Sequence, residues 1–242
     1  MRNRLAILSL VGSASLVLTF TGCADDGADS SGQSTPTPAP PGEMIDDMED
    51  KDGAILEVSG RSGAWYTSND ESKDGTQTPA SDADFTMTEL EAPREKSKYA
   101  ARCQGSGFKE WGAAFGFNLN EPDGKDRGTY DASKYAGLVF WARNGEAGPQ
   151  SFTLAFVDDQ TDPQGGNCDE SKADDCWDHF ATSVKLTDKW EQYEIEIADL
   201  KQGGWGKKFD ALHLNALYSV EFQNEAAVDF DIWIDDIAFT EE

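Results

Sequence analysis

Basic side chains are scarce in this sequence of 242 residues, and their scarcity limits what the protein can bind. Lysine and arginine together number 20, against 46 aspartates and glutamates, which gives a formal net charge of −26 at pH 7. Nucleic acids and anionic lipid surfaces attract proteins through basic patches, so a chain this acidic argues against both as partners. The charge is compatible with neutral ligands, such as sugars, and with divalent cations.

Recognisable catalytic motifs are also missing from the sequence. It contains no nucleophile elbow, no phosphate-binding loop and no paired-histidine zinc motif, and its two histidines, His179 and His213, lie apart. A metal site built from cysteines is not expected either, because the four cysteines do not form two closely spaced pairs. The sequence therefore offers no familiar active site, and we expect a protein that is not an enzyme.

The N-terminal part of the chain differs in composition from the rest. Residues 1–22 begin with two arginines followed by an uncharged stretch, too short and wrongly flanked for a spanning helix, which is typical of a secretory signal. Thr21-Gly22-Cys23 resembles a bacterial lipobox, which implies that Cys23 becomes the acylated N-terminus. An ordinary signal peptide cut elsewhere is the alternative. Residues 23–42 are rich in Pro, Ser, Thr and Asp and predict a disordered tether.

These features predict a lipoprotein of the bacterial cell envelope that works outside the cytoplasm. The membrane would be contacted through the lipid anchor only. Ala24, directly after the cysteine, favours the outer membrane under the sorting rule known for enteric bacteria. The remaining residues, 43–242, are numerous enough for one domain with a sizeable core.

The three cysteines of this domain are expected to have different roles. Cys168 and Cys176 flank a short polar segment and should pair as a disulfide in an oxidising compartment. Cys103 occupies an inward position of an expected strand, which favours a buried free thiol.

Apolar side chains alternate with polar ones at every second residue through much of the domain, the pattern of half-buried strands. No window shows a sustained helical stripe, and only residues 197–200 are expected to form a single helical turn. Nine or more strands in one domain of this size predict an all-β fold, a β-sandwich of the jelly-roll type. The expected strands are residues 54–59, 99–103, 111–119, 137–143, 151–157, 179–186, 190–197, 217–223 and 229–239.

The same alternation separates core side chains from outward ones. A flat indole can stack on the C–H groups of a sugar ring, and planar polar groups can pair with its hydroxyls, so the outward set suits a glycan. The alternative is that the two outward tryptophans are covered by loops or by a second sheet edge. Expected in the core are Leu138, Phe140, Ala142, Val220, Phe222, Phe230, Ile232 and Ile234. Expected to share a ligand-binding face are Trp141, Arg143, Glu221, Gln223, Asp231 and Trp233, with His179 as a further contact.

Three segments carry a resemblance to a known family. They are the acidic opening at residues 44–50 (MIDDMED), the segment at residues 130–143 (YDASKYAGLVFWAR), and the ending at residues 229–239 (DFDIWIDDIAF). In these segments the chain resembles the galactose-binding-like jelly rolls that include many carbohydrate-binding modules, family 11 in particular. The resemblance covers about residues 44–242 and implies the same fold.

The resemblance also implies a structural calcium ion between the first and last strands. The residues at the matching positions are Asp47, Glu49 and Asp235, with Asp236 as a second donor from the last strand. Hard oxygen donors of this kind suit Ca²⁺ rather than zinc. The alternative is that some of these carboxylates are exposed and unpaired.

Taken together, the sequence predicts a surface-anchored, non-catalytic lipoprotein that captures or adheres to polysaccharide, with cell-surface enzymes as further partners. The first alternative is an envelope scaffold module that has the same fold and binds protein. The second is a glycoside hydrolase, because residues 194–199 (EIEIAD) are similar to the carboxylate-bearing strand of β-sandwich glucanases. In that comparison the third acid is the shorter Asp199 where a longer Glu would be needed.

Overall fold

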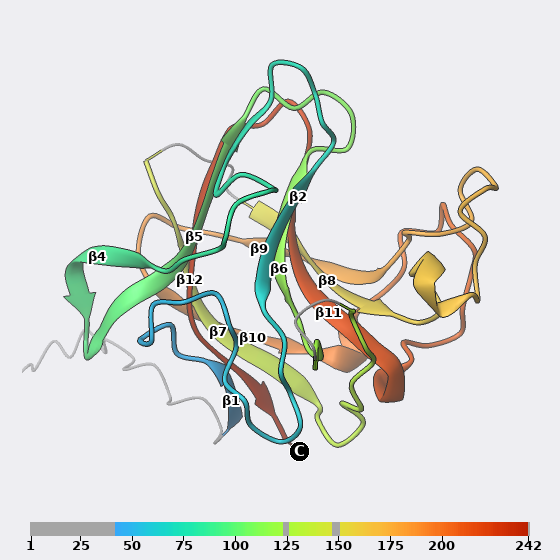
Figure 1. Ribbon diagram of the computed structural model, residues 1–242, viewed down its shortest axis with the longest axis horizontal. Coiled ribbons are helices and arrows are strands. Elements are labelled where there is room, and N and C mark those ends of the chain that lie inside the picture. The colour runs from blue at the N-terminus through green and yellow to red at the C-terminus, as the bar shows by residue number, and fades with distance from the viewer. Residues whose placement is uncertain (1–41, 123–125, 147–150, 242) are drawn as a thin grey trace, which may run out of the picture. The chain divides into compact units, whose positions relative to one another are not determined.

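The computed structural model describes residues 42–122, 126–146 and 151–241 (Figure 1). These residues form two antiparallel β-sheets that enclose one core, which confirms the predicted all-β sandwich. The predicted signal peptide, Cys23 and residues 24–41 lie outside the described residues, and Gly42, expected in the tether, begins the first strand. Within the described residues, no helix has both the length and the apolar character that a membrane crossing requires.

The larger sheet has seven strands in the order β10-β7-β12-β5-β3, with β1 beside β12 and β4 beside β5. Its central strand, β12, pairs with β7 along one side, and with both β5 and β1 along the other. The first and last strands of the domain therefore lie side by side, as the resemblance implies. The bounds are β1 (Gly42–Asp46), β3 (Thr76–Thr78), β4 (Thr88–Arg94), β5 (Ser97–Ser106), β7 (Gly137–Asn144), β10 (Glu191–Glu196) and β12 (Phe230–Thr240).

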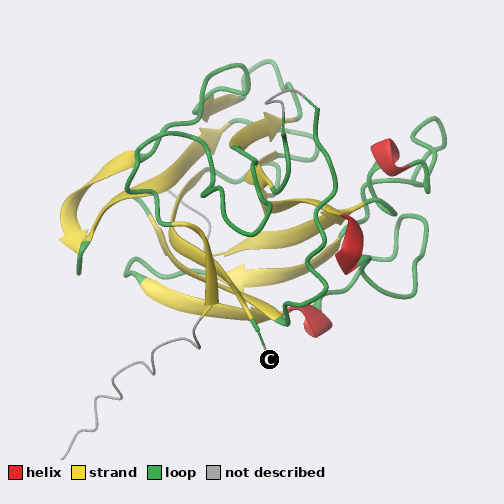
Figure 2. Cartoon of the chain, turned by 60° about the horizontal axis from the view of Figure 1, so that its bottom comes forward, coloured by secondary structure: helices red, strands yellow, loops and turns green. Residues whose placement is uncertain are grey.

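The smaller sheet has five strands in the order β2-β6-β11-β8-β9. Short 3₁₀ turns lie in the loops that connect the strands (Figure 2), and one of them, η2, confirms the single turn expected at residues 197–200. The bounds are β2 (Trp65–Asn69), β6 (Ala113–Asn118), β8 (Ser151–Asp158), β9 (Phe180–Lys185), β11 (Leu217–Asn224), η1 (Pro163–Gly165), η2 (Ile197–Asp199) and η3 (Leu214–Ala216).

The strands expected between residues 99 and 239 correspond to β5 to β12, with ends that differ by a few residues. The strand expected at residues 54–59 is wrong, because this segment contributes only an isolated bridge between Ala54 and Ala64. The strands β2, β3 and β4 were not predicted. These segments contain many polar residues and are short or irregular. They form strands because they pair with neighbouring strands, not because their own sequence pattern favours it.

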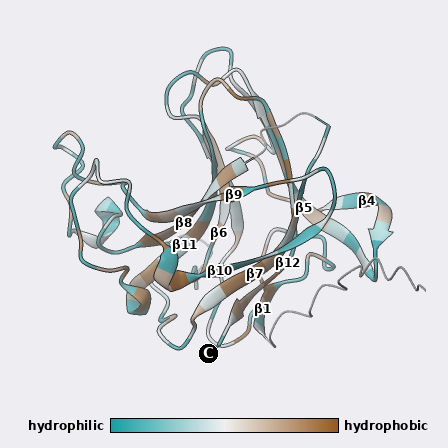
Figure 3. Cartoon of the chain, turned by 180° about the vertical axis from the view of Figure 1, so that it is seen from behind, coloured by the Kyte–Doolittle hydropathy of each residue, from teal (hydrophilic) through white to brown (hydrophobic). Residues whose placement is uncertain are grey.

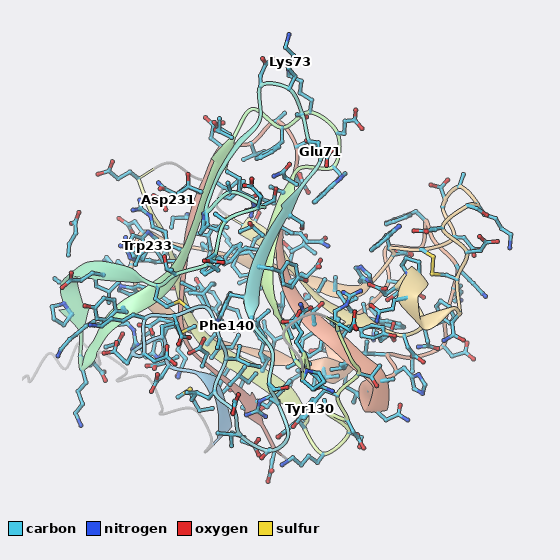
Figure 4. The ribbon with its side chains drawn as sticks, in the orientation of Figure 1. Glu71, Lys73, Tyr130, Phe140, Asp231 and Trp233 are labelled. Atoms are coloured by element: carbon cyan, nitrogen blue, oxygen red, sulfur yellow. A yellow bond between two sulfur atoms is a disulfide. The ribbon has the colours of Figure 1, made fainter. Side chains whose placement is uncertain are left out.

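Aromatic side chains join the two sheets through the core. Phe140 of β7 meets Phe222 of β11 edge to face, with ring centroids 5.9 Å apart, and Phe152 of β8 at 6.3 Å. The labelled Phe140 lies between the sheets in Figure 4, and hydrophobic colour follows the strands rather than the loops in Figure 3. All eight residues expected in the core are fully or almost fully buried there.

The cysteines are placed as expected. Cys168 and Cys176 form a disulfide in the loop between β8 and β9, with their Cα atoms 5.3 Å apart. Cys103 is a buried free thiol on β5, where burial raises its pKa to about 12, so it stays protonated and unreactive.

A buried carboxyl group, Asp46, ends β1 and is fully shielded from solvent. Its Oδ2 accepts a hydrogen bond of 2.7 Å from the indole Nε1 of Trp65, and its Oδ1 accepts one of 2.9 Å from the amide of Met48. Burial raises the pKa of Asp46 to about 7, because these two donors do not replace the hydration that a carboxylate loses.

This raised pKa makes the fold sensitive to pH. The unfolded state releases the Asp46 proton near pH 4 and the folded state only near pH 7, so stability from this group is complete below pH 4 and is lost as the pH rises to about 7. We expect Asp46→Asn to remove this loss, which is about 2–4 kcal/mol. Urea unfolding of the unaltered protein and of Asp46→Asn, at several pH values between 4 and 8, measures the free energy of unfolding of each. Parallel pH profiles for the two proteins would contradict the assignment.

Candidate functional site

The residues expected to share one ligand-binding face lie on opposite sides of the sandwich. Trp141 and Arg143 belong to β7, and Asp231 and Trp233 to β12, all in the seven-stranded sheet. Glu221 and Gln223 belong to β11, which pairs with β6 and β8 in the other sheet. The expectation of one shared face is therefore wrong. Figure 4 shows Asp231 and Trp233 on the side of β12 and β5 that faces away from the five-stranded sheet.

Trp233 points out of the shared core, as the alternation predicts, but it is not open to a ligand. Its side chain is only 4% exposed, because Leu90 of β4, Ala100 of β5 and Trp190 pack around it. The sequence alternative, in which an outward tryptophan is covered by neighbouring structure, holds for this residue. Asp231 is also buried, and its two oxygens accept hydrogen bonds of 2.9 and 2.7 Å from Arg102.

Arginines and tryptophans alternate across this outer face. Arg143 lies between two indoles, with its guanidinium carbon 4.7 Å from the ring centroid of Trp233 and 5.3 Å from that of Trp190. Stacked guanidinium and indole groups cover one another's flat surfaces, so much of the indole area of this face is already in contact with arginine. Trp141 and Arg143 remain partly exposed. The order of the stack is Arg102, Trp233, Arg143, Trp190, Arg94 and Trp141.

The carboxylates that the resemblance assigned to calcium have other partners. Asp235 is fully buried, and its Oδ2 accepts hydrogen bonds from Arg94 Nε at 3.1 Å and from Ser97 Oγ at 2.6 Å. Arg94 also forms an ion pair with Asp236. A guanidinium thus occupies the place beside the last strand where the cation was expected.

The two carboxylates expected from the first strand do not complete a metal site. Asp47 and Glu49 follow the end of β1, in a turn where Met48 has a positive φ of 60°, so they do not project from one side of a strand. Glu49 Oε1 instead accepts the amides of Lys98 and Tyr99, at 2.7 and 3.0 Å. Among the residues that the structure describes, no group of three or more acidic, histidine or cysteine side chains could hold a metal. The residues present do not fit the expected calcium ion.

The outer face of the five-stranded sheet has a different composition. Small side chains form its floor, and the register aligns one row across all five strands: Tyr66, Gly116, Glu221, Ala155 and Ala181. The next row consists of Ser68, Ala114, Gln223, Thr153 and Ser183. A low floor with one aromatic ring, one carboxylate and one amide is suited to a flat polar ligand.

Hydrogen bonds hold the polar groups of this face in place. The Tyr66 hydroxyl donates to Glu221 Oε1 at 2.6 Å, and Gln223 Nε2 donates to Glu221 Oε2 at 3.0 Å. Burial, together with the charge of Glu221, raises the pKa of Tyr66 well above its ordinary value, so the phenol stays protonated. Of the residues expected to bind a ligand, Glu221 and Gln223 lie on this face. Tyr66 joins them from β2, a strand that the sequence pattern does not predict, in which Trp65 is buried and Tyr66 is partly exposed.

His179 lies directly before β9, at the same sheet. Its Nδ1 is 2.8 Å from Thr161 Oγ1, and that hydroxyl donates to Asp158 Oδ1 at 2.7 Å. Because the hydroxyl proton is directed to Asp158, Nδ1 must be the protonated ring nitrogen and Nε2 the acceptor. Burial lowers the pKa of His179, which keeps the ring neutral. His179 can therefore offer a fixed acceptor to a hydroxyl group.

Comparison with known proteins identifies what this architecture is similar to. The family model described as "Carbohydrate binding domain 30" matches residues 55–241. None of the curated proteins compared with the chain matches it.

Solved structures share the fold at low sequence identity. The family 11 carbohydrate-binding module of a cellulosomal cellulase of Clostridium thermocellum is 14% identical, with a TM-score of 0.51 over 84% of this chain and 96% of that one. A family 11 module from the same organism, in complex with a β-1,3-1,4-mixed-linked tetrasaccharide, is 15% identical, with a TM-score of 0.50 over 84% and 97%. A family 30 module of a cellulosomal cellulase of that organism is 17% identical, with a TM-score of 0.50 over 82% and 96%.

The buried position of Trp233 has a measurable consequence. We expect Trp233→Ala to lower the free energy of unfolding by about 3–5 kcal/mol, because it leaves a cavity under the arginine stack. Trp111, which is 52% exposed, provides a matched control, and Trp111→Ala should change stability by no more than about 0.5 kcal/mol. Urea unfolding measures both variants, and equal stabilities would contradict the burial of Trp233.

The role of Arg94 can be separated from that of a metal. We expect Arg94→Ala to destabilise the fold by about 3–5 kcal/mol, because it leaves the buried Asp235 without its counter-ion. The melting temperature of the unaltered protein should be the same with calcium and with a chelator. A fall of several degrees on chelation would show that a metal, and not Arg94, neutralises these carboxylates.

Proposed function

The chain belongs to the family of carbohydrate binding domain 30, and on that premise we propose that it binds a neutral polysaccharide without cleaving it. The observation that carries the proposal is the row of Tyr66, Gly116, Glu221, Ala155 and Ala181 across the outer face of the five-stranded sheet. Ala155 is only 1% exposed, so a ligand on this row would contact the partly exposed Tyr66, Glu221 and Ala181. The polar residues among them provide directed hydrogen bonds.

The chemistry of this face favours sugar over other ligands. A partly exposed tyrosine ring can stack on sugar C–H groups, while the Glu221 carboxylate, the Gln223 amide and Nε2 of His179 accept or donate hydrogen bonds to hydroxyls. Because Glu221 is already fixed by Tyr66 and Gln223, little side-chain entropy is lost when a ligand binds. The net charge of −26 supports a neutral glycan rather than an acidic one.

A binding role without catalysis is supported by where the carboxylates lie. Glycoside hydrolysis needs two carboxyl groups that flank one glycosidic bond. Glu194 and Glu196, from the segment that is similar to a glucanase strand, lie on β10 in the other sheet and are exposed. They are therefore separated by the whole sandwich from Glu221.

The cellular setting of this function is proposed from the sequence. Acylation of Cys23 would anchor the chain to the cell envelope, with the outer membrane favoured, and the segment up to residue 41 would act as a spacer. The domain would then capture polysaccharide at the cell surface, or hold the cell or a cell-surface enzyme against it.

Binding to a soluble neutral β-glucan tests the proposed face. We expect Tyr66→Ala and Glu221→Gln to weaken binding to mixed-linked β-1,3-1,4-glucan at least tenfold, about 1.4 kcal/mol or more. Glu194→Gln, the same change at an exposed carboxylate of the other sheet, should bind like the unaltered protein. Affinity electrophoresis and isothermal titration measure these affinities. Unchanged affinity in both face variants would reject this face. A protein that binds no neutral glycan but retains a protein partner would support the scaffold alternative.

A further inference from the structure

Two of the most exposed large hydrophobic side chains in the described residues are tryptophans on two loops that contact each other. Trp177, in the loop between β8 and β9, is 51% exposed, and Trp205, in the loop after η2, is 54% exposed. Exposing an indole forgoes the free energy of burying it, so exposed tryptophans on a well-braced surface point to an interaction site.

The loop that carries Trp177 is held at several points. The disulfide between Cys168 and Cys176 closes it directly before the tryptophan, and the amide of Trp177 donates to the carbonyl of Thr161 at 2.8 Å. Trp177 has a φ of 73°, in the left-handed region that a bulky side chain rarely adopts. A costly conformation at an exposed indole, maintained by a disulfide and hydrogen bonds, indicates that the position of this side chain matters.

Asp178 connects this loop to the loop of Trp205. Its buried carboxylate accepts three backbone amides, from Gly203 at 2.7 Å, Gly204 at 2.8 Å and Gly206 at 3.1 Å. Three donors around one carboxylate compensate for its burial and fix the turn that carries Trp205.

The glycines of this turn are required by the close contact. A Cβ atom on Gly206 would lie 2.4 Å from the Cβ of Asp178, and Gly204 has a φ of 87°. The Gln202 side chain adds a further link, because its Nε2 donates to the carbonyl of Asp178 at 2.8 Å. The two loops thus form one braced unit, which presents Trp177 and Trp205 with little freedom left to lose on binding.

This unit is continuous with the proposed glycan-binding face. The ring of Trp177 meets that of His179 edge to face, with centroids 6.1 Å apart, and Lys201, shortly before the Trp205 turn, bridges to Ala181 of β9. Because β9 is the edge strand of the five-stranded sheet, the tryptophans lie at the end of the face opposite to β2 and Tyr66.

We propose that Trp177 and Trp205 form a second aromatic contact for a neutral polysaccharide, beyond the edge strand β9, which only a long chain reaches from Tyr66. From β2 to β9 the sheet spans four inter-strand spacings, about 19 Å in total. The two loops carry both acidic and lysine side chains, and the net charge of −26 disfavours an anionic chain. The inference rests on the proposed function and adds that affinity depends on the length of the glycan chain.

Affinity for long and short ligands separates this contact from the sheet face. We expect Trp205→Ala to weaken binding to polymeric mixed-linked β-glucan about tenfold, and to leave binding to a β-linked glucose disaccharide unchanged within a factor of two. Trp205→Phe keeps a stacking ring and should recover most of the affinity for the polymer. Tyr66→Ala should weaken binding to both ligands. Because Trp205 is exposed and outside the core, its two variants are expected to melt like the unaltered protein.

The outcomes distinguish the two proposals. If Trp205→Ala binds the polymer as tightly as the unaltered protein while Tyr66→Ala does not, the second contact is rejected and the proposed function stands. If Trp205→Ala weakens binding to the polymer and to the disaccharide equally, the dependence on length is rejected. If the unaltered protein binds neither ligand nor other neutral glycans, the proposed function fails and the second contact fails with it.

Discussion

The side chains of each strand point to two sides of its sheet, and only those on one side can pack into the core that the two sheets share. The inward positions are filled by aromatic and branched side chains, with Phe140, Phe152 and Phe222 in contact across the sheets. Burial of this set fixes the register of every strand, since a slip of one residue would exchange the faces. The protein is consequently left with two outer faces on opposite sides of the molecule, and a ligand on one cannot contact the other.

The two outer faces differ in composition and packing. On the seven-stranded sheet, alternating arginines and tryptophans stack on one another, and two of these arginines form ion pairs with carboxylates, Arg102 with Asp231 and Arg94 with Asp235. In this arrangement arginine side chains neutralise the buried carboxylates, and Trp233 is covered. On the five-stranded sheet, glycine and alanines keep the surface low, while Tyr66, Glu221 and Gln223 are held by hydrogen bonds but remain partly exposed. We therefore propose the second face as the ligand-binding one.

The sequence alone predicts which side chains leave the core, but not what they meet outside it. Period-two alternation correctly placed Phe140 inward and Trp233 outward, and the ends of the chain carried the resemblance to the carbohydrate-binding jelly rolls. Which strands become neighbours depends on pairings between distant residues, so the separation of Trp233 from Gln223 could not be found from local patterns. The burial of Trp233 depends on β4, a polar strand that the alternation does not reveal. Arg94 lies 141 residues before its partner Asp235, so no local pattern indicates this pair.

The central claim is that neutral glycan binds the outer face of the five-stranded sheet. Amide chemical shifts of the isotope-labelled protein, titrated with a mixed-linked β-glucan oligosaccharide, test this claim most directly. The account predicts that the shifts that change belong to β2, β6, β11 and β8, centred on Tyr66, Gly116 and Glu221, while those around the arginine stack stay constant. Changes centred on Trp141 and Trp233 of the seven-stranded sheet, or no changes at all, would contradict it.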